Sequence, residues 1–531
     1  RKSLSMPPKK NRQTTWVTLF VAIGSIGYGY AASIIGQVLG QPQFFESFNL
    51  AQEGPGLGYT NAIIGAMNGI FFAGTTLGCL FIAWTATAFG RLRTIQIASC
   101  VCIFGAALMA GSVNIPMYLA SRFIMGWGVG MLVCGIPLYQ AELSPPQSRG
   151  FHVGLHGSGL GCGYSLSGFT GFGCFYAAKS SFQWRFPFAL QLVPMLILLC
   201  GSLFLPESPR WLLSNDRKEE AWKVIQRLHS DPNDANDTFA KSEMYQMTEQ
   251  FTLDHGRMQT LGITKWWHFF QQPNYRKRLV VGVGATLTVA CSMNLVMNNY
   301  QVHIYNQLGL HGGIPILLLA IWNVFGMLGN MNGAILLMDR FGRKNVFMLG
   351  IASTAACLAA EAALTKYFVQ TGSTNRVGLG FGVFFIFLYV VFFASCMDAQ
   401  QYVIVSETFP MEFRSIGVAI SLAAQYCAAA LFVGVAPISF ANIGYLFYVV
   451  FVCLDVCTFF LVWKFIPEMK GLSLEEINEL FGDPVAVHIT HADKQETEEI
   501  DRRIENFDIK SADLGEDTPP ARVEDSREQK V

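Results

Sequence analysis

The chain has 531 residues, of which 52 % are apolar and 14 % charged, and its formal net charge is zero. A soluble domain carries roughly 25 % charged residues, so the composition excludes an ordinary soluble fold. The charges gather in a few short segments and form no basic surface, so we expect no nucleic-acid partner. This composition is typical of a polytopic membrane protein.

Twelve apolar stretches are long enough to cross a bilayer as helices, which takes about 20 residues each. Helices are expected because backbone groups in lipid must bond within their own segment, and no barrel-like alternation is present. The stretches cover residues 16–38, 58–84, 94–112, 116–139, 151–175, 184–205, 279–300, 313–338, 344–364, 378–402, 415–438 and 442–465. We therefore expect an all-α membrane protein with twelve transmembrane helices in two pseudo-symmetric six-helix bundles.

The two groups of six stretches divide the chain into five parts. They are a tail at 1–15, an N-terminal bundle at 16–205, a linker at 206–278, a C-terminal bundle at 279–466 and a second tail at 467–531. Charged residues close together at 217–223 predict short amphipathic helices in the linker. After about residue 483 the second tail is charged and poor in aromatic residues, which is typical of disorder.

Basic residues set the expected orientation. The first tail, the linker and the loops that hold Arg91, Arg149, Arg343 and Arg414 lie on one side of the predicted spans, and most opposite loops are poor in Lys and Arg. Basic loops face the cytosol. We therefore expect a multi-pass protein in contact with the lipid bilayer, with both termini cytosolic.

The residues that would support an enzyme are missing. All thirteen cysteines lie in or at the edge of apolar stretches, which favours free, buried thiols that pack between helices. We find no set of residues for a metal site or for nucleophilic catalysis, and no Gly-x4-Gly-Lys-Ser/Thr loop for ATP. We expect no cofactor and no enzymatic activity.

Three motifs recur at matching places in the two halves. They are Thr87–Arg93 with Asp339–Lys344, Glu142 and Arg149 with Glu407 and Arg414, and Pro206–Trp211 with Pro467–Gly471. In both halves the Arg follows the Glu by seven residues. Parallel repeats of this kind are typical of transporters that rock one half against the other.

Together with Trp184–Pro187 and Gln191, these motifs resemble those of the sugar porter family of the major facilitator superfamily, in its fungal form. The resemblance covers about residues 16–480. It implies a carbohydrate transporter that works by alternating access, as facilitated uniport or proton symport. It also implies a monomer in the plasma membrane, with a small-molecule sugar as substrate.

Opposite charges at helix ends on the cytosolic side can hold the two halves together in one state of the transport cycle. The resemblance implies that a gating charge network is formed by Arg91, Glu142, Arg149, Glu207, Arg210, Asp339, Arg343, Glu407, Arg414 and Glu468. The alternative is that these residues are solvated loop charges, which contribute about 0–1 kcal/mol per pair.

Sugars are held by Gln, Asn and Trp side chains, so polar residues within spans are the candidate contacts. Where the family has two Gln and an Asn in the seventh span, this chain has Met293, Asn294 and Asn299. Tyr402 replaces a Trp, and Gln425 begins a pair that replaces Asn-Trp. The predicted substrate contacts are Asn294, Asn299, Gln425 and Tyr402, with His156 and Gln401 behind them. The alternative is that these side chains only pack helices together, and the lost glutamines argue against a standard glucose site.

Proton coupling is open at this point. In proton-coupled family members the arginine matched by Arg122 faces an Asp in the first span, but Ala31 stands there in this chain, and Thr87 replaces the first loop Asp. Either the protein is a facilitator, or another group carries the proton. The candidates for proton coupling are Arg122, His156 and Asp398, with His303, Glu361 and Asp455 as further ionisable groups.

Two other functions fit the same residues. A sugar sensor on the same fold would bind its ligand without carrying it. Alternatively, the transported molecule is a polyol, a quinate-like acid or an oligosaccharide.

Overall fold

The computed structural model describes residues 12–52, 54–145, 148–177, 180–229, 237–260, 266–371, 375–410, 413–470, 472 and 477–483. Within these ranges every regular element is a helix, which confirms the predicted all-α fold. The predicted disorder after about residue 483 concerns a segment outside the described residues.

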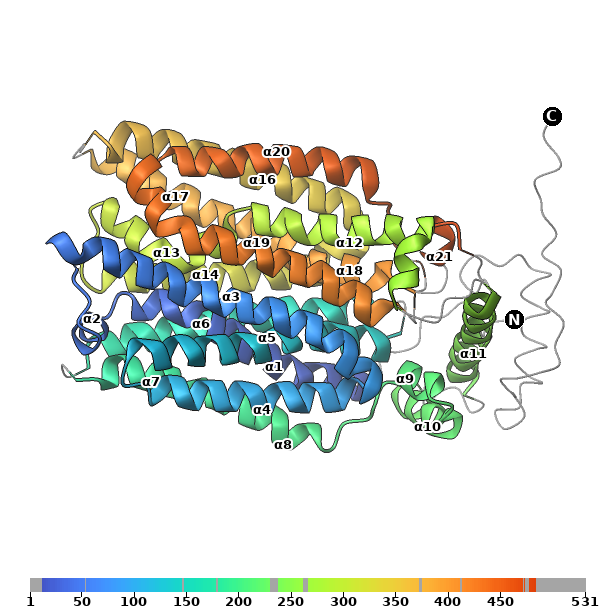
Figure 1. Ribbon diagram of the computed structural model, residues 1–531. Helices are drawn as coiled ribbons and strands as arrows, with labels where there is room; N and C mark the ends of the chain where they lie inside the picture. Colours follow the sequence, from blue (N-terminus) through green and yellow to red (C-terminus); the bar gives the residue numbers. More distant parts are fainter. Residues whose placement is uncertain are drawn as a thin grey trace, which may run out of the picture.

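The first half of the chain forms one bundle of long helices that run side by side (Figure 1). Its elements are α1 (Arg12–Val38), α2 (Pro42–Ser47), η1 (Gly54–Gly56), α3 (Leu57–Ala88), α4 (Arg91–Ala110), α5 (Ile115–Leu143), α6 (Arg149–Phe175), α7 (Phe182–Leu190) and α8 (Leu192–Ser202). The start of α5 shows how the sequence fixes a boundary. The Asn114 side chain accepts a hydrogen bond from the Met117 amide at 2.9 Å, and Pro116 lies in the first turn.

The second half forms the other bundle, which lies above the first in Figure 1. Its elements are α12 (Pro273–Cys291), α13 (Asn294–Gln307), α14 (Ile314–Asn332), η4 (Gly333–Leu337), α15 (Met338–Phe341), α16 (Arg343–Leu364), η5 (Thr365–Val369), α17 (Arg376–Phe393), η6 (Ala394–Asp398), α18 (Ala399–Thr408), α19 (Arg414–Ile443) and α20 (Leu446–Phe465). Several of these spans are interrupted. Met293 has a left-handed φ of 70° and separates α12 from α13, and η4, η5 and η6 are π-helical.

Eleven helices or continuous helical runs among the described residues are long and apolar enough to cross a membrane. The remaining predicted span is α6, which has 27 residues and packs between α1 and α14. Its many glycines and two histidines lower its hydropathy. The glycines also let it approach its neighbours closely, since the space beside Gly163 is filled by the backbone of Ile26 and the space beside Gly168 by Ala320.

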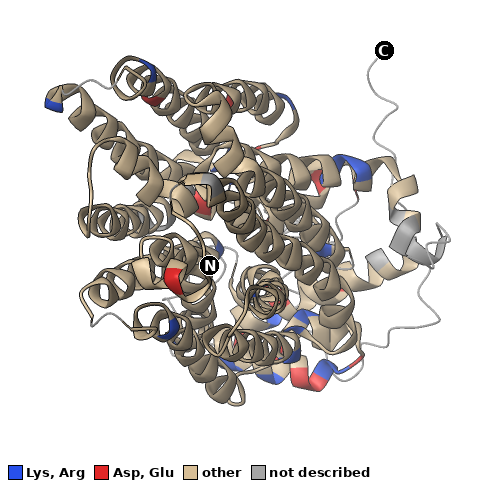
Figure 2. Cartoon of the chain, turned by 60° about the vertical axis from the view of Figure 1, so that its left-hand side comes forward, with Lys and Arg blue, Asp and Glu red and all other residues tan. Residues whose placement is uncertain are grey.

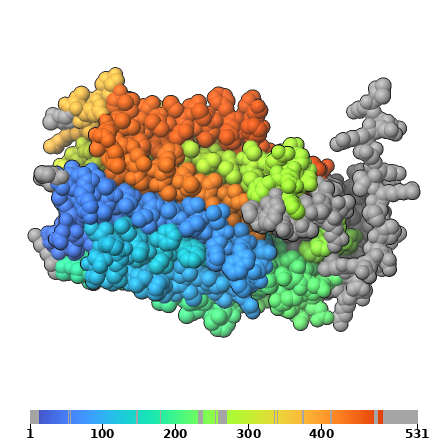
Figure 3. Space-filling model, in the orientation of Figure 1, coloured from blue at the N-terminus to red at the C-terminus, as the bar shows by residue number. Residues whose placement is uncertain are grey.

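The two bundles meet along two main helix pairs, α3 with α19 and α6 with α14. In Figure 3 the blue surface of α3 borders the orange surface of α19. Gly65 on α3 lies directly against the carbonyl of Gly434 on α19. This close contact brings polar groups from both halves within reach of one another.

The linker forms α9 (Pro209–Ser214), α10 (Lys218–His229), α11 (Thr238–Thr260) and η3 (Trp266–Gln271). The helices α9 to α11 gather at one end of the bundles, which we name the linker end; the opposite end, where α2 lies, is the α2 end (Figure 1). Side-chain bonds join the linker helices to the first bundle. Thr14 donates to the Leu228 carbonyl at 2.6 Å, and Trp211 Nε1 donates to the Thr87 carbonyl at 2.9 Å.

A short helix near the end of the described chain, α21 (Ile477–Leu480), docks at the linker end of the second bundle. The guanidinium of Arg278 donates to the Asn478 side chain at 3.0 Å and to Asp483 at 2.5 Å. Arg278 is fully buried. The segment therefore covers the start of α12.

The outer surface of the bundles suits a lipid environment. Lys, Arg, Asp and Glu are sparse along the long helices (Figure 2). Large apolar side chains project outward instead, among them Leu77, Trp84, Phe104, Phe384 and Phe460. An apolar belt of this kind is compatible with the hydrocarbon core of a bilayer.

Candidate substrate cavity and charge network

A cavity of about 640 Å³ opens at the α2 end between the two bundles. Its wall comes from α1 and α3 of the first half and from α13 and α19 of the second. The polar residues that line it are Gln41, Gln52, Thr60 and Asn61 from the first half and Asn299, Tyr300, His303, Asn306 and Gln307 from the second. A cavity rich in amide groups from both halves can hydrogen-bond the hydroxyl groups of a small molecule.

Asn299 is the predicted contact that reaches this cavity. Its amide nitrogen donates to the Leu295 carbonyl one turn earlier at 2.7 Å, which fixes the side chain against α13. Its Oδ1 has no hydrogen-bond partner among the described residues, although the side chain is buried. A buried acceptor without a donor is suited to a ligand hydroxyl.

His156 and Tyr402 come together where α6 meets α18. Their ring centroids are 4.6 Å apart in an edge-to-face arrangement, and His156 Nδ1 lies 2.8 Å from the Ser25 hydroxyl. Beside them the hydroxyls of Tyr28 and Tyr426 are hydrogen-bonded at 2.7 Å. These contacts connect the two halves through an aromatic layer.

The other three predicted contacts do not line the cavity. Asn294, Gln401 and Gln425 are buried, and each has a side-chain oxygen without a hydrogen-bond partner among the described residues. Gln401 bonds to the carboxylate of Asp398, which also accepts from Asn330 Nδ2 at 2.9 Å. These side chains are polar groups in the interior rather than a single constellation.

Sequence reasoning missed several polar residues that the fold gathers between the bundles. Asn298 donates to Asn323 Oδ1 at 3.0 Å, and Tyr300 donates to the Val433 carbonyl at 2.9 Å. Tyr28 was missed because a tyrosine in an apolar span resembles a packing residue. Asn298 and Tyr300 could have been found from the sequence, because they belong to a polar run, Asn298 to Gln301, within an apolar span.

Buried charges gather at the linker end of the first half. Arg91 makes two bonds to Glu142, at 2.8 and 2.9 Å, with the Glu142 side chain fully buried. Glu207 accepts from the Arg91 and Leu92 amides at the start of α4, at 3.0 and 3.1 Å. The hydroxyl of Ser208 also bonds to Glu142. The carboxylate of Glu142 thus holds the Arg91 guanidinium, and the carboxylate of Glu207 caps α4, the helix that carries Arg91.

The second half repeats this arrangement. Arg343 lies 3.4 Å from Glu407, and Glu468 accepts from the amides of Arg343 at 2.7 Å and Lys344 at 3.2 Å. The turns before the two arginines are alike, because Gly90 and Gly342 have φ values of 94° and 88° that favour glycine. The repeated sequence motif therefore corresponds to a repeated local structure.

Contacts at the linker end also cross between the halves. Thr87 on α3 lies 3.2 Å from the hydroxyl of Ser415 on α19, and Arg414 is near enough to act electrostatically on Glu142. Arg149 and Arg210 are 1 % and 5 % exposed and both interact with other groups, so neither is a solvated loop charge. The side chain of Asp339 lies outside the described part of the structure.

Glu207 lies in the connection between α8 and α9, outside the spans. Burial raises the pKa of its carboxyl above the usual value, and the backbone donors at residues 91, 92 and 208 oppose this. These backbone donors stabilise the charged form of the carboxylate against the cost of burial.

Arg122 is fully buried on α5, where its Nε donates to the Met67 carbonyl of α3 at 3.2 Å. Among the described residues no Asp or Glu lies within ion-pairing distance of it. This agrees with the sequence, in which Ala31 stands where an Asp was expected to face Arg122. The described residues also include no cluster of three His, Cys, Asp or Glu side chains that could hold a metal ion.

Comparison with known proteins places the chain among transporters. The sequence profile of the family described as sugar (and other) transporter matches residues 17–481. The MFS-type transporter criB of Aspergillus cristatus is 30 % identical over 478 residues, covering 90 % of this chain and 95 % of the relative. A quinate permease of Neurospora africana is 29 % identical over 85 % of this chain and 86 % of its own.

The solved structure of the proton:xylose symporter XylE bound to 6-bromo-6-deoxy-D-glucose has the same fold. It superposes with a TM-score of 0.76 at 23 % identity and covers 88 % of this chain and 99 % of its own. The predicted major facilitator fold and the assignment as a transporter rather than an enzyme are confirmed. With its repeated charge clusters and its cavity between two bundles, the chain belongs to the sugar (and other) transporter family.

Proposed function

We propose that the protein carries a small polyhydroxylated molecule, a sugar or a sugar-like compound, across the membrane by alternating access. The observation that carries this proposal is the cavity of about 640 Å³, which opens at the α2 end and is lined by amide groups from both halves. Buried charge pairs close the linker end. Such an arrangement represents one of the two states of a rocking transporter.

Names of the relatives support this substrate class. One curated relative is a quinate permease, and the solved structure contains a halogenated hexose. Both compounds are small rings with several hydroxyl groups, which amide side chains can recognise.

The basic residues of the linker and of the adjoining loops support a cytosolic linker end. The cavity then faces outward, and the protein acts as a monomer in the plasma membrane. We assign the gating role to the paired charges of both halves, led by Arg91 with Glu142 and Arg343 with Glu407.

We assign substrate contact first to Asn299, because it reaches the cavity. His156 and Tyr402 form the layer that a substrate would meet deeper between the halves. Asn294, Gln401 and Gln425 then act only after the halves have moved.

Uptake of radiolabelled compounds tests the function. The full chain is expressed in yeast that lacks its own hexose transporters, and uptake of hexoses, polyols and quinate is compared with that of the empty host. We expect saturable uptake of at least one compound. Saturable binding to the purified protein with no uptake of any of them would contradict transport and identify a sensor.

A further inference from the structure

Arg122 is a buried charge with no counter-ion among the residues that the structure describes. Its guanidinium lies 4.2 Å from the ring centroid of Phe71, and its Nη1 reaches the Ala31 carbonyl only at 3.5 Å. Its Nη2 has no hydrogen-bond partner among the described residues. Carbonyl groups and a ring face compensate a buried positive charge poorly, so the site is short of an anion.

A neighbouring side chain in the described structure also lacks a hydrogen-bond acceptor. Tyr118 lies one turn earlier on α5, beside the guanidinium, and its fully buried hydroxyl has no hydrogen-bond partner among the described residues. Two unused donors, Arg122 Nη2 and the Tyr118 hydroxyl, thus lie together in the interior. Paired donors of this kind, one of them charged, suit a carboxylate.

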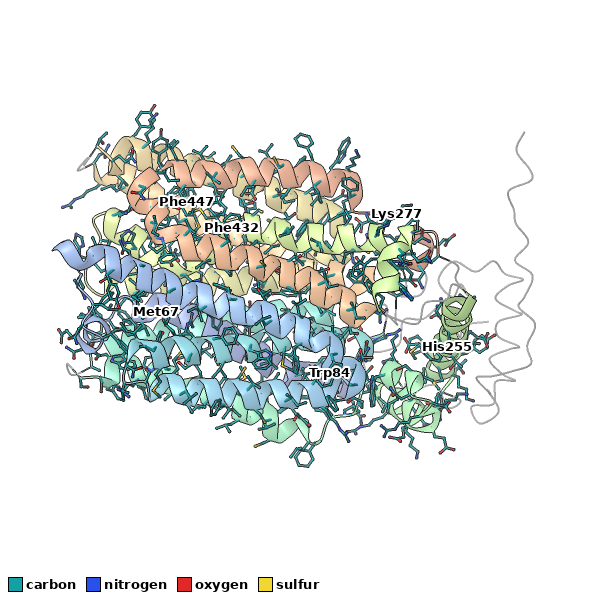
Figure 4. All side chains as sticks on the ribbon, in the orientation of Figure 1. Met67, Trp84, His255, Lys277, Phe432 and Phe447 are labelled. Carbon is teal, nitrogen blue, oxygen red and sulfur yellow. The ribbon has the colours of Figure 1, made fainter. Side chains whose placement is uncertain are left out.

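This site lies close to the cavity, on the side away from the α2 end. Gly36 and Ile64 line the cavity, and the carbonyls that contact Arg122 belong to Ala31 and Met67, five and three residues further from the α2 end. Those separations correspond to roughly 5 to 8 Å along a helix. Figure 4 shows Met67 on α3 toward the α2 end, with Trp84 on the same helix toward the linker end.

A hydrogen-bonded pair connects the cavity wall with the surroundings of Arg122. Tyr300 lines the cavity, accepts a bond from Asn68 Nδ2 at 3.1 Å, and is near enough to interact electrostatically with Arg122. Asn68 follows Met67, whose carbonyl holds the guanidinium. A ligand group that replaced the bond between Asn68 and Tyr300 would reach Arg122 from the cavity.

We propose that the substrate supplies the missing anion: it is a hydroxylated organic acid whose carboxylate binds Arg122 and Tyr118. Its hydroxyl groups bond to Asn299 and the other amides of the cavity. This inference rests on the proposed transport function and narrows its substrate class. A neutral sugar would leave the guanidinium without a counter-ion.

Thermal unfolding of the purified full chain tests the charge requirement directly. The probes are quinate, its neutral methyl ester, glucose and inorganic phosphate. We expect quinate alone to raise the unfolding temperature saturably, and Arg122→Gln to abolish that shift. An equal shift with the methyl ester, a shift with glucose but not quinate, or a shift with phosphate alone would each overturn the hydroxy-acid assignment.

A pair of variants of equal size tests the site in cells. Ala31→Asp would place a carboxylate beside Arg122 and compete with the substrate, whereas Ala31→Asn adds similar volume without charge. We expect quinate uptake to fall about tenfold further in Ala31→Asp than in Ala31→Asn at matched surface expression. Equal uptake in the two variants would contradict the inference.

The failures of the two proposals are distinguishable. Uptake of a neutral hexose by the unmodified chain, with no uptake of quinate, overturns the carboxylate inference and leaves transport in place. Lack of uptake of every compound by the correctly inserted protein overturns transport itself.

Discussion

Asn299 combines burial, a fixed orientation and an unused acceptor at the cavity surface. The bond from its nitrogen to Leu295 uses one donor, and Oδ1 is left for a ligand. Few side chains of the described interior have all three properties. This makes the residue the sharpest test of the proposed contacts.

Replacing Asn299 with Ala should therefore weaken uptake, because one hydrogen bond to the substrate is lost. A bond of this kind contributes about 1 kcal/mol, so KM should rise about fivefold. Cys291→Ala is the matched control, since Cys291 lies at the end of α12 and does not line the cavity. Concentration-dependent uptake of the best substrate checks this, and equal effects of the two changes would count against the site.

At the scale of elements, the helix ends at the linker end carry the charge pairs to which we assign the gating role. Glu142 binds Arg91 on α4, bonds to Ser208 before α9, and lies near Arg414 on α19. One carboxylate therefore connects three parts of the molecule. Removing its charge should favour opening at that end.

Glu142→Gln should lower the accessibility of the cavity, because the state closed at the linker end loses stabilisation. A cysteine introduced at Asn306, which lines the cavity, reports accessibility through its rate of labelling by a membrane-impermeant thiol reagent. We expect the rate to fall several-fold. Glu46→Gln makes the same change at an exposed position on α2 and should leave the rate unchanged. An unchanged rate in Glu142→Gln would contradict the gating role.

The linker helices carry a contact that depends on pH. His229 Nε2 lies 2.9 Å from the Leu143 carbonyl at the end of α5, and its Nδ1 pairs with Glu243 on α11. Burial disfavours the charged imidazole, but Glu243 outweighs burial and raises the pKa of His229 above its usual value near 6.5. The positive charge of Arg210 acts in the opposite direction and lowers the pKa of His229.

Because the folded pKa of His229 is raised, protonation stabilises the docked linker below about pH 6.5, the unfolded value. That stabilisation is lost as the pH rises through the folded value. Hydrogen exchange of α10 and α11, corrected for the intrinsic rate, should show protection that declines over this range. His229→Gln should remove the pH dependence, and an unaltered profile in that variant would contradict the assignment.

Sequence predicted the elements well, because each apolar stretch is long and contains few charged residues. It could not predict the break at Met293, since a left-handed φ on a methionine has no local signature. The candidate site could be predicted from the sequence only in part. Asn299 stands out as an amide in an apolar span, whereas the bond between Tyr28 and Tyr426 joins residues 398 positions apart and depends on how the halves meet.

At the scale of the whole molecule, Arg122 without an acid opposite supports facilitated transport rather than proton symport through that pair. In proteoliposomes with the membrane potential clamped at zero, an inside-alkaline pH gradient should then produce no accumulation above equilibrium. Uphill accumulation would contradict uniport. Loss of that accumulation in Asp398→Asn or His156→Gln would identify the proton carrier.

The break at Met293 has a mechanical consequence. It divides the seventh span into two helices. The helix toward the α2 end, α13, carries Asn299, His303 and Asn306 on the cavity wall, and the helix toward the linker end, α12, is anchored by Arg278. A hinge at Met293 would let α13 move over a bound molecule while α12 stays in place. Closing the α2 end and opening the linker end would then be separate steps, and this predicts an occluded intermediate in which both ends are closed.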